Sequence, residues 1–491
     1  KEQFIGYVQE LAGTEVDALM CCPTAWRLPT YYSEVNPVWQ TWAKKHKDPN
    51  PVADWKYFDK VFHRIKEYML RDDYEDPIQI TLDAAKKLGI DFFFSYRMND
   101  HHVSYYNEKR ISPTMDPIWL EHPEMRLDTG NGHYGMNYLC QEVREWYFSV
   151  IEELVSKYDI DGFELDFMRS PHYFPEESIE VGMGLMTEFV NRIRGLLERT
   201  GLERGKRLKL SVRVPWTVEK CLETGLDIKT WKREKLVDMI NASSFFCTSP
   251  EIDVESFKKL AGNANIYGEM HFVTCKGDGE LTSNINRRTT PMIYKTMTAS
   301  FLERGADGIS LFNFAYVRNH HFSEARRRKY MNLEPPFETL KNITDLNNLN
   351  NQDVHYIIPS GFGTLPQNIP ARNPLSFQVF LACEPDEGNY AKAVLRLELS
   401  RPGYIYSGLK AFISEVELDQ TTGQGELFKP FSNEALPHPE CLFFFSIPLD
   451  LLKHGWNQVL IEASIVDEYF SLSLAGFQLK CVELALYKNT K

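Results

Sequence analysis

One stretch decides the fold: Asp161-Gly162-Phe163-Glu164-Leu165-Asp166-Phe167. Its largely apolar, uninterrupted character is typical of a strand that is buried on both faces of a parallel sheet. Because side chains alternate along a strand, Gly162, Glu164 and Asp166 share one face. Two acidic side chains on an inner face cost free energy unless they are well paired or take part in chemistry. The stretch therefore predicts a parallel sheet and a candidate site together.

Further apolar runs lie on both sides of this strand, at residues 16–22, 90–96, 208–214, 237–242, 264–270 and 308–314. Amphipathic helical patterns separate them, for example Val143, Trp146, Val150 and Leu154. Repeated strand–helix units predict an α/β fold with a parallel sheet, either a barrel or a doubly wound sheet. We expect a (β/α)8 TIM-type barrel. An eighth strand is not recognisable, and we expect it before Lys1 or in an unrecognised part of the chain.

The pattern changes after about residue 350. Short runs that alternate apolar and polar side chains follow at residues 377–382, 394–399, 411–418, 442–447, 458–463 and 477–486. This alternation predicts an antiparallel β-sandwich, of the galactose-binding-like or jelly-roll kind. We therefore expect a catalytic barrel at 1–347 and a sandwich at 348–491, with 337–351 forming the last barrel helix and the linker. No exposed aromatic platform is recognisable in the sandwich, which favours bracing of the barrel over glycan binding.

Composition excludes several classes of protein. The chain has 491 residues and a net charge of −13, which disfavours binding to a nucleic-acid backbone. No apolar run is long enough to span a bilayer. The nine Cys residues form no CxxC pair and no disulfide framework. No signal peptide is visible, but the chain begins at Lys1 without Met, as a mature chain would, and we expect a secreted or periplasmic protein. The sequence does not predict an oligomeric state.

If the unrecognised strand is the first, residues 161–167 form the fourth strand and residues 264–270 the seventh. A second acidic candidate, Glu269, lies at the end of this seventh strand. In a barrel, the carboxyl ends of the strands converge on one site. A glycosidase needs one carboxyl group that is protonated and one that is ionised, and a retaining mechanism places them ~5–5.5 Å apart. Carboxylates on the fourth and seventh strands are placed to meet this requirement.

Basic and polar residues gather at the same strand ends: Arg97, Asn99, His101, Arg169, His172, Arg213, Trp216, His271 and Asn313. Because guanidinium groups suit anions, these residues predict binding of an anionic glycan, sulfated or uronic. The alternative is that the cations pair with acids of the site and its loops. The pairs His101-His102 and His320-His321 lack metal-ligand spacing, so we expect no metal and no cofactor.

Aromatic residues provide candidates for sugar stacking. Trp216 follows the fifth strand, and Trp119 and Tyr173 lie in long loops. The loop from Arg97 to about Tyr138 is long enough to be functional and to wall off part of a site. Packing in the core or the loops is the alternative for each ring.

Three segments in order carry a family resemblance: Gly89–Phe94, Asp161–Asp166 and Gly305–Asn313. Together they resemble the family-10-like barrel glycosidases, which are relatives of the clan A retaining hydrolases, over roughly residues 1–345. The resemblance implies Glu164 or Asp166 as acid/base and Glu269 as nucleophile, although the Asn-Glu pair typical of the clan is absent. The chain is also similar to glycoside hydrolase family 167, which acts on carrageenan. The central strand further resembles the Gly-Phe-Arg-Leu-Asp strand of amylase-type barrels, which would make Asp166 the nucleophile.

These observations predict a retaining glycoside hydrolase that cleaves a polysaccharide or oligosaccharide, with an anionic, carrageenan-type glycan as the expected substrate. Three alternatives stay open. The barrel could be a catalytically inactive glycan-binding protein, an amylase-type hydrolase, or a deacetylase or lyase. A deacetylase would require a metal site, which the sequence does not predict.

Overall fold

The computed structural model describes residues 1–25, 27–37, 64–101, 117–128, 134–245, 247–275, 287–316, 318, 334–359, 363–369, 373–400, 409–422, 426–428, 441–463 and 478–489. The chain divides into two compact units, which are described separately. The first unit contains residues 1–242 and 256–266, and the second contains residues 243–255 and 267–491. The boundary expected near residue 347 stays a prediction.

A seven-stranded sheet has the order β1-β4-β7-β8-β9-β10-β13. Its strands are β1 (Ala18–Cys21), β4 (Asp91–Arg97), β7 (Gly162–Asp166), β8 (Lys209–Pro215), β9 (Met239–Ser243), β10 (Asn265–His271) and β13 (Gly308–Phe312). The pairs β1–β4, β4–β7, β7–β8 and β10–β13 are parallel. Each strand coincides with a run predicted from the sequence, and the fold class, a parallel β/α sheet of barrel type followed by antiparallel sheets, is confirmed. The eighth barrel strand stays a prediction.

Helices lie between the strands: α1 (Glu2–Gln9), α4 (Pro77–Lys87), α5 (Pro117–Glu121), α6 (Gln141–Lys157), α7 (Ile179–Arg204), α8 (Val218–Glu223), α9 (Ile228–Arg233), α10 (Val254–Lys259) and α11 (Pro291–Glu303). Local signals set their ends. The Asp76 carboxylate accepts hydrogen bonds from the first backbone N–H groups of α4, and α7 ends at Gly205 with φ 68°. No helix in the described ranges combines the length and the hydropathy that crossing a bilayer requires.

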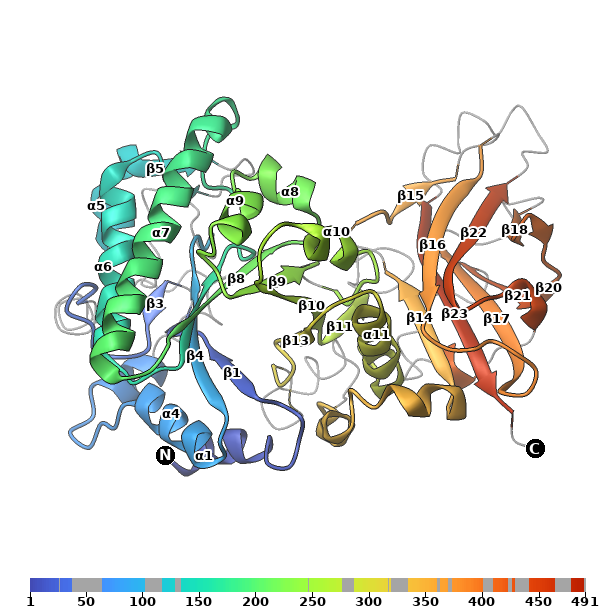
Figure 1. Cartoon of the computed structure of the whole chain (residues 1–491), viewed down its shortest axis with the longest axis horizontal. Coiled ribbons are helices and arrows are strands. Elements are labelled where there is room, and N and C mark those ends of the chain that lie inside the picture. Colours follow the sequence, from blue (N-terminus) through green and yellow to red (C-terminus); the bar gives the residue numbers. More distant parts are fainter. Residues whose placement is uncertain are drawn as a thin grey trace. The chain divides into compact units, whose positions relative to one another are not determined.

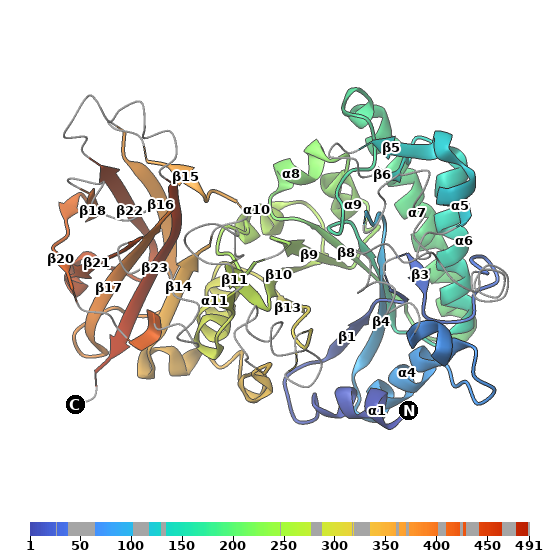
Figure 2. The same cartoon turned by 180° about the vertical axis from the view of Figure 1, so that it is seen from behind.

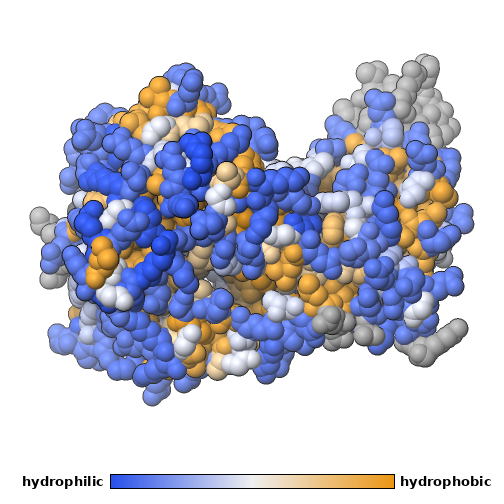
Figure 3. All heavy atoms as spheres, in the orientation of Figure 1, coloured by the Kyte–Doolittle hydropathy of each residue, from blue (hydrophilic) through white to orange (hydrophobic). Residues whose placement is uncertain are grey.

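Helices α6 and α7 lie side by side along the parallel strands of the first unit (Figure 1). Their inner faces bury apolar side chains such as Val143, Ile151 and Ile193, while their outer faces are mostly hydrophilic (Figure 3). Each residue of β7 is buried. The strand that bears Glu164 and Asp166 therefore has little contact with water, and its acidic groups must find partners inside the protein.

The second unit contains two antiparallel sheets that face each other (Figure 2). One has the order β14-β23-β17-β21-β20, and the other has the order β16-β22-β18-β19. Their strands are β14 (Val354–Ile358), β16 (Leu375–Leu381), β17 (Tyr390–Leu399), β18 (Leu409–Ile413), β19 (Val416–Glu417), β20 (Gln420–Thr421), β21 (Leu442–Ile447), β22 (Gly455–Ala463) and β23 (Gln478–Lys488), with β15 (Gln367–Asn368) beside β23. The inner faces form one apolar core.

Every run predicted for the sandwich coincides with one of these strands, but β14 was not predicted. The segment expected to hold the last barrel helix forms two short 3₁₀ helices instead, Phe337–Lys341 and Leu346–Asn351. The second is rich in Asn, which favours turns over a continued α-helix. Short hairpins complete the described elements: β2 (Thr24–Ala25) with β3 (Leu28–Pro29), β5 (Arg126–Asp128) with β6 (Tyr134–Met136), and β11 (Val273–Cys275) with β12 (Arg287–Arg288).

Candidate active site

Glu164 is a buried carboxyl group held by two serine hydroxyls. In the register of the sheet it lies between Ser95 on β4 and Ser211 on β8. Ser95 Oγ donates to Oε1 at 2.7 Å and Ser211 Oγ donates to Oε2 at 3.0 Å. Burial raises the pKa of Glu164 to about 7, the two hydroxyls oppose this increase, and the charge of Asp166 adds to it. A carboxyl group with a pKa near 7 is suited to both donate and accept a proton at neutral pH.

Asp166, the last residue of β7, forms a buried ion pair. Its Oδ1 accepts hydrogen bonds from Arg213 Nη1 and from the backbone N–H of Met168, both at 2.9 Å. The side chains of Asp166 and Arg213 are 3% and 1% exposed. The ion pair that the sequence left open as an alternative is therefore present for Asp166. β7 therefore carries one acid that is bound by a guanidinium group beside Glu164, whose pKa is about 7.

Two further predicted arginines, Arg97 and Arg169, lie near these acids. Arg97 Nη1 donates to Asp100 Oδ2 at 2.7 Å, and Arg97 lies opposite Asp166 in the sheet. Burial lowers the pKa of Arg169 to about 10, and the positive charges of Arg97 and Arg213 contribute to the decrease. The two aspartates oppose it. A buried guanidinium group such as Arg169, which nearby positive charges repel, is suited to an anionic ligand, because an anion offsets this repulsion.

Asn99, His101 and His172 follow the strand ends, as predicted. Asn99 is fully buried, and its amide bonds to the backbone of Met136 and to the carbonyl of His172. The rings of His101 and His172 lie 6.0 Å apart. A side chain at Gly135 would place a Cβ 2.4 Å from His101 Nε2, so a glycine there makes room for that ring. The structure thus brings Asn99, His101 and His172 together, and their contact with substrate stays a prediction.

The aromatic candidates differ in exposure. Trp119 is 2% exposed and the Arg126 guanidinium lies 3.9 Å from its ring centroid. Tyr173 is 1% exposed and its hydroxyl donates to the carbonyl of Phe167 at 2.5 Å. Both rings are therefore buried, Trp119 on α5 and Tyr173 in the segment after β7, and packing was the alternative interpretation. Trp216 is half-buried directly after β8 and remains suited to sugar stacking. His102, His320, His321 and part of the 97–138 loop lie outside the described residues.

Glu269 belongs to the second unit, near the end of β10. It is 2% exposed and accepts a hydrogen bond of 2.5 Å from Ser243 Oγ. His271 is equally buried, and its Nδ1 accepts the backbone N–H of Val273 at 3.1 Å. Asn313 directly follows β13 with φ 54°, a left-handed conformation that Asn tolerates better than most residues.

Sequence reasoning missed the hydroxyls that hold the carboxyl groups: Ser95, Ser211 and Ser243. A signal was available for two of them. Ser95 lies two residues before Arg97 and Ser211 two before Arg213, so strand alternation places each on the inner face with its arginine. Among the described residues, no group of three or more His, Cys, Asp or Glu side chains is arranged to hold a metal ion.

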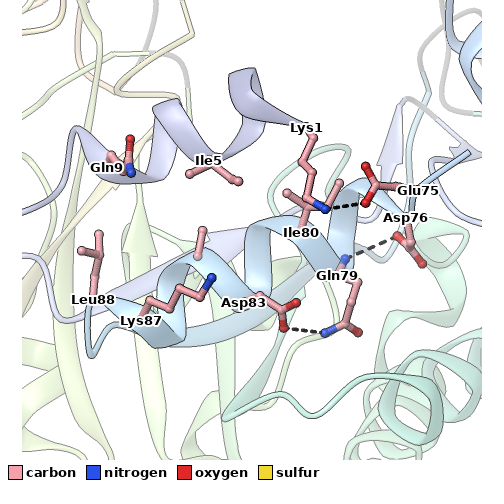
Figure 4. Close-up of a pocket in the computed structure, with 11 residues that line it drawn as sticks. Lys1, Ile5, Gln9, Glu75, Asp76, Gln79, Ile80, Asp83, Lys87 and Leu88 are labelled. Atoms are coloured by element: carbon pink, nitrogen blue, oxygen red, sulfur yellow. Dashed lines mark hydrogen bonds and ion pairs between the residues drawn. The ribbon is translucent and has the colours of Figure 1, made fainter.

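A pocket of about 470 Å³ lies between α1 and α4, away from these residues (Figure 4). The ion pair Lys1–Glu75, 2.5 Å long, and the hydrogen bond between Gln79 and Asp83 line it. None of the predicted site residues is among the side chains that line this pocket. It therefore belongs to the helical layer and not to the strand ends.

Comparisons with known proteins give only distant likenesses. No protein-family model and no curated protein match the chain. A Paenibacillus cycloisomaltooligosaccharide glucanotransferase is 10% identical with TM-score 0.26, over 83% of this chain and 47% of that one, so the chain spans about half its length. A family GH18 chitinase from Chromobacterium violaceum is 8% identical with TM-score 0.36, over 80% and 78% of the two chains. A bacterial fucosidase is 10% identical with TM-score 0.38, over 94% and 81%.

These likenesses do not confirm family 10 or family 167, and both resemblances stay predictions. The TM-scores are too low to carry a conclusion about chemistry. The function is therefore inferred from the described side chains themselves.

Proposed function

We propose that this protein is a retaining glycoside hydrolase in which Glu164 is the general acid/base. The observation that carries the proposal is the state of Glu164, a buried carboxyl group with a pKa of about 7, beside Asp166, which forms a buried ion pair with Arg213. A structural ion pair alone would not leave a second, titrating acid on the same strand. Asp166 assists by raising the pKa of its neighbour.

In the proposed reaction, Glu164 acts first in its protonated form as an acid and then in its ionised form as a base. Glu164 protonates the leaving oxygen while Glu269 attacks the anomeric carbon, so that the glycosidic C–O bond breaks and a glycosyl ester forms. Glu164, now ionised, takes a proton from water, the water oxygen bonds to the anomeric carbon and the ester bond breaks. The role of Glu269 is a prediction from its place on β10 and from its buried, hydroxyl-bound carboxylate.

We further propose that the substrate is anionic, with a sulfate or a carboxylate. Arg169 supports this proposal, because burial and the charges of Arg97 and Arg213 lower its pKa, and a bound anion would favour its charged form. A carrageenan-type polysaccharide is one substrate of this class. Secretion or a periplasmic location stays an expectation that accompanies such a substrate.

A second candidate is an amylase-type hydrolase in which Asp166 is the nucleophile. One observation favours it: no hydrogen bond to Oδ2 of Asp166 is found within the described part of the chain. The variant Glu269→Gln separates the candidates. The retaining mechanism with Glu269 as nucleophile predicts loss of turnover, and near-normal turnover would remove Glu269 from the mechanism and favour Asp166.

The experiment that tests the function is a screen of sulfated and uronic glycans against the same glycans after desulfation or carboxyl reduction, with analysis of the products by chromatography and mass spectrometry. We expect shorter glycans from the anionic substrates only. Binding without products would indicate a glycan-binding protein, and unsaturated products that absorb in the ultraviolet would indicate a lyase. Glu145→Gln, which alters an exposed glutamate on α6, is the matched control for Glu164→Gln.

A further inference from the structure

A buried charge cluster surrounds Glu483 in the second unit. Glu483 lies on β23 and is 0% exposed. Arg287 binds it with both guanidinium arms, at 2.6 Å to Oε1 and 3.0 Å to Oε2. His355 Nε2 lies 2.7 Å from Oε2, and Arg396 Nη2 donates to Oε1. Burial alone would raise the pKa of Glu483, but the positive charges of Arg287 and Arg396 outweigh burial and hold it well below its ordinary value.

The members of this cluster come from two kinds of structure. His355, Arg396 and Glu483 belong to β14, β17 and β23 of the antiparallel sheet. Arg287 belongs to β12, 196 residues before Glu483 in the chain. The hairpin of β11 and β12 follows directly after β10, the strand that bears Glu269. The cluster thus joins the sandwich to the segment that follows the predicted nucleophile.

Short contacts lead from Arg287 toward Glu269. Arg287 pairs with Cys275 in the hairpin. Two residues further on, Thr289 donates from Oγ1 to the carbonyl of His271 at 2.6 Å and from its backbone N–H to the carbonyl of Phe272 at 2.8 Å. The position of β12 therefore bears directly on the backbone of His271, two residues after Glu269.

We propose that the sandwich sheet holds the end of β10 in place through the ion pair of Glu483 and Arg287, so that both are positioning residues for Glu269. The expected effect on turnover rests on the proposed function, whereas the expected effect on the local stability of residues 269–275 does not. A bracing role also fits Trp456, an exposed tryptophan of the sandwich, because the Arg304 guanidinium lies 4.7 Å from its ring centroid.

The test begins with Arg287→Met, which keeps an unbranched apolar side chain and removes both bonds to Glu483. Arg396 and His355 still hold the carboxylate, and Arg287 is 16% exposed, so folding should survive. Amide hydrogen exchange of residues 269–275 should become about tenfold faster or more, because local opening of this segment becomes easier. Exchange of β7 should not change. Arg287→Lys keeps the charge and should recover part of the protection, and it serves if Arg287→Met does not fold.

A matched control is Arg192→Met, which breaks an exposed two-armed pair with Glu145, 2.6 Å at both contacts. It should leave exchange of residues 269–275 unchanged. If Arg287→Met accelerates exchange equally in β7 and in residues 269–275, or in neither, the proposal that the ion pair of Glu483 and Arg287 holds the end of β10 is wrong.

Turnover provides a second readout that a general loss of stability would not mimic. On any glycan that the wild type hydrolyses, Arg287→Met should lower kcat about tenfold and change KM little, because only an interaction specific to the transition state is disturbed. A change in KM alone would contradict a positioning role. If the wild type hydrolyses no glycan, the proposed function fails. Hydrogen exchange alone then still decides whether the ion pair of Glu483 and Arg287 holds the end of β10.

Discussion

Replacing Glu164 by Gln should stabilise the protein at pH 8 and change its stability little at pH 5. Glutamine resembles the protonated carboxyl group in shape and can keep bonds to Ser95 and Ser211. The pKa of Glu164 is raised from 4.5 to about 7, mainly by burial. The folded state therefore holds this proton more tightly than the unfolded state, and the stability contributed by the proton is lost as pH rises from 4.5 through 7.

The size of the effect follows from the raised pKa. Each tenfold change in proton affinity corresponds to about 1.4 kcal/mol, so ionising Glu164 inside the folded protein costs about 3 kcal/mol at pH 8. At pH 5 the cost is below about 1 kcal/mol, because Glu164 stays protonated in the folded state and is only partly ionised in the unfolded chain. The variant Glu164→Gln avoids this cost at both pH values.

Urea unfolding of the wild type and of Glu164→Gln at pH 5 and pH 8 measures this difference. The control Glu145→Gln removes a carboxylate whose pKa is lowered by its hydrogen bond to Arg192, so it should lose stability above its ordinary pKa. Because that pair is 45% and 43% exposed, the loss should be less than about 1 kcal/mol. Equal stability of Glu164→Gln and the wild type at pH 8 would refute the raised pKa.

Three further predictions concern the same unit. Asp166→Ala leaves Arg213 buried without its carboxylate and should cost about 3–5 kcal/mol in urea unfolding, so a loss below about 1 kcal/mol would contradict a buried pair. Gly162→Ala places a Cβ 2.1 Å from the Phe93 ring. It should cost about 1–3 kcal/mol and lower Tm, and an unchanged Tm would show that the strands are less tightly packed. Arg169→Met should raise KM for an anionic glycan about tenfold, with partial recovery in Arg169→Lys, and an unchanged KM would remove Arg169 from binding.

The strands were predictable because each is a buried apolar run of suitable length between turn and helix signals. The run that contains Phe92, Phe93 and Phe94 is of this kind. Strand β14 was missed although all five of its residues are buried, because Val354–Ile358 lies between the expected linker and the first predicted run of the sandwich and contains His355. Its burial depends on β23, which is more than one hundred residues away along the chain, and no local pattern reports such a pairing.

The placement of Glu164 and Asp166 on one face of a strand was predictable, but their partners were not. Strand alternation alone places Glu164 and Asp166 on one inner face. Which of them meets Arg213 depends on the register between β7 and β8, and that register also gives Glu164 its serine partner Ser211. Glu483 shows the same limit, because its arginine Arg287 is separated from it by most of the second unit. Pairing across strands is a property of the fold and not of the local sequence.

The central claim is that Glu164 protonates the leaving oxygen, and one comparison tests it most directly. Turnover of Glu164→Gln is measured on a natural glycan and on a nitrophenyl glycoside of the same sugar, whose leaving group needs little protonation. We expect kcat/KM on the glycan to fall by about 10²–10⁴-fold, with a much smaller decrease on the nitrophenyl glycoside. Equal decreases on both substrates, or no decrease on either, would contradict the assignment of Glu164 as the general acid.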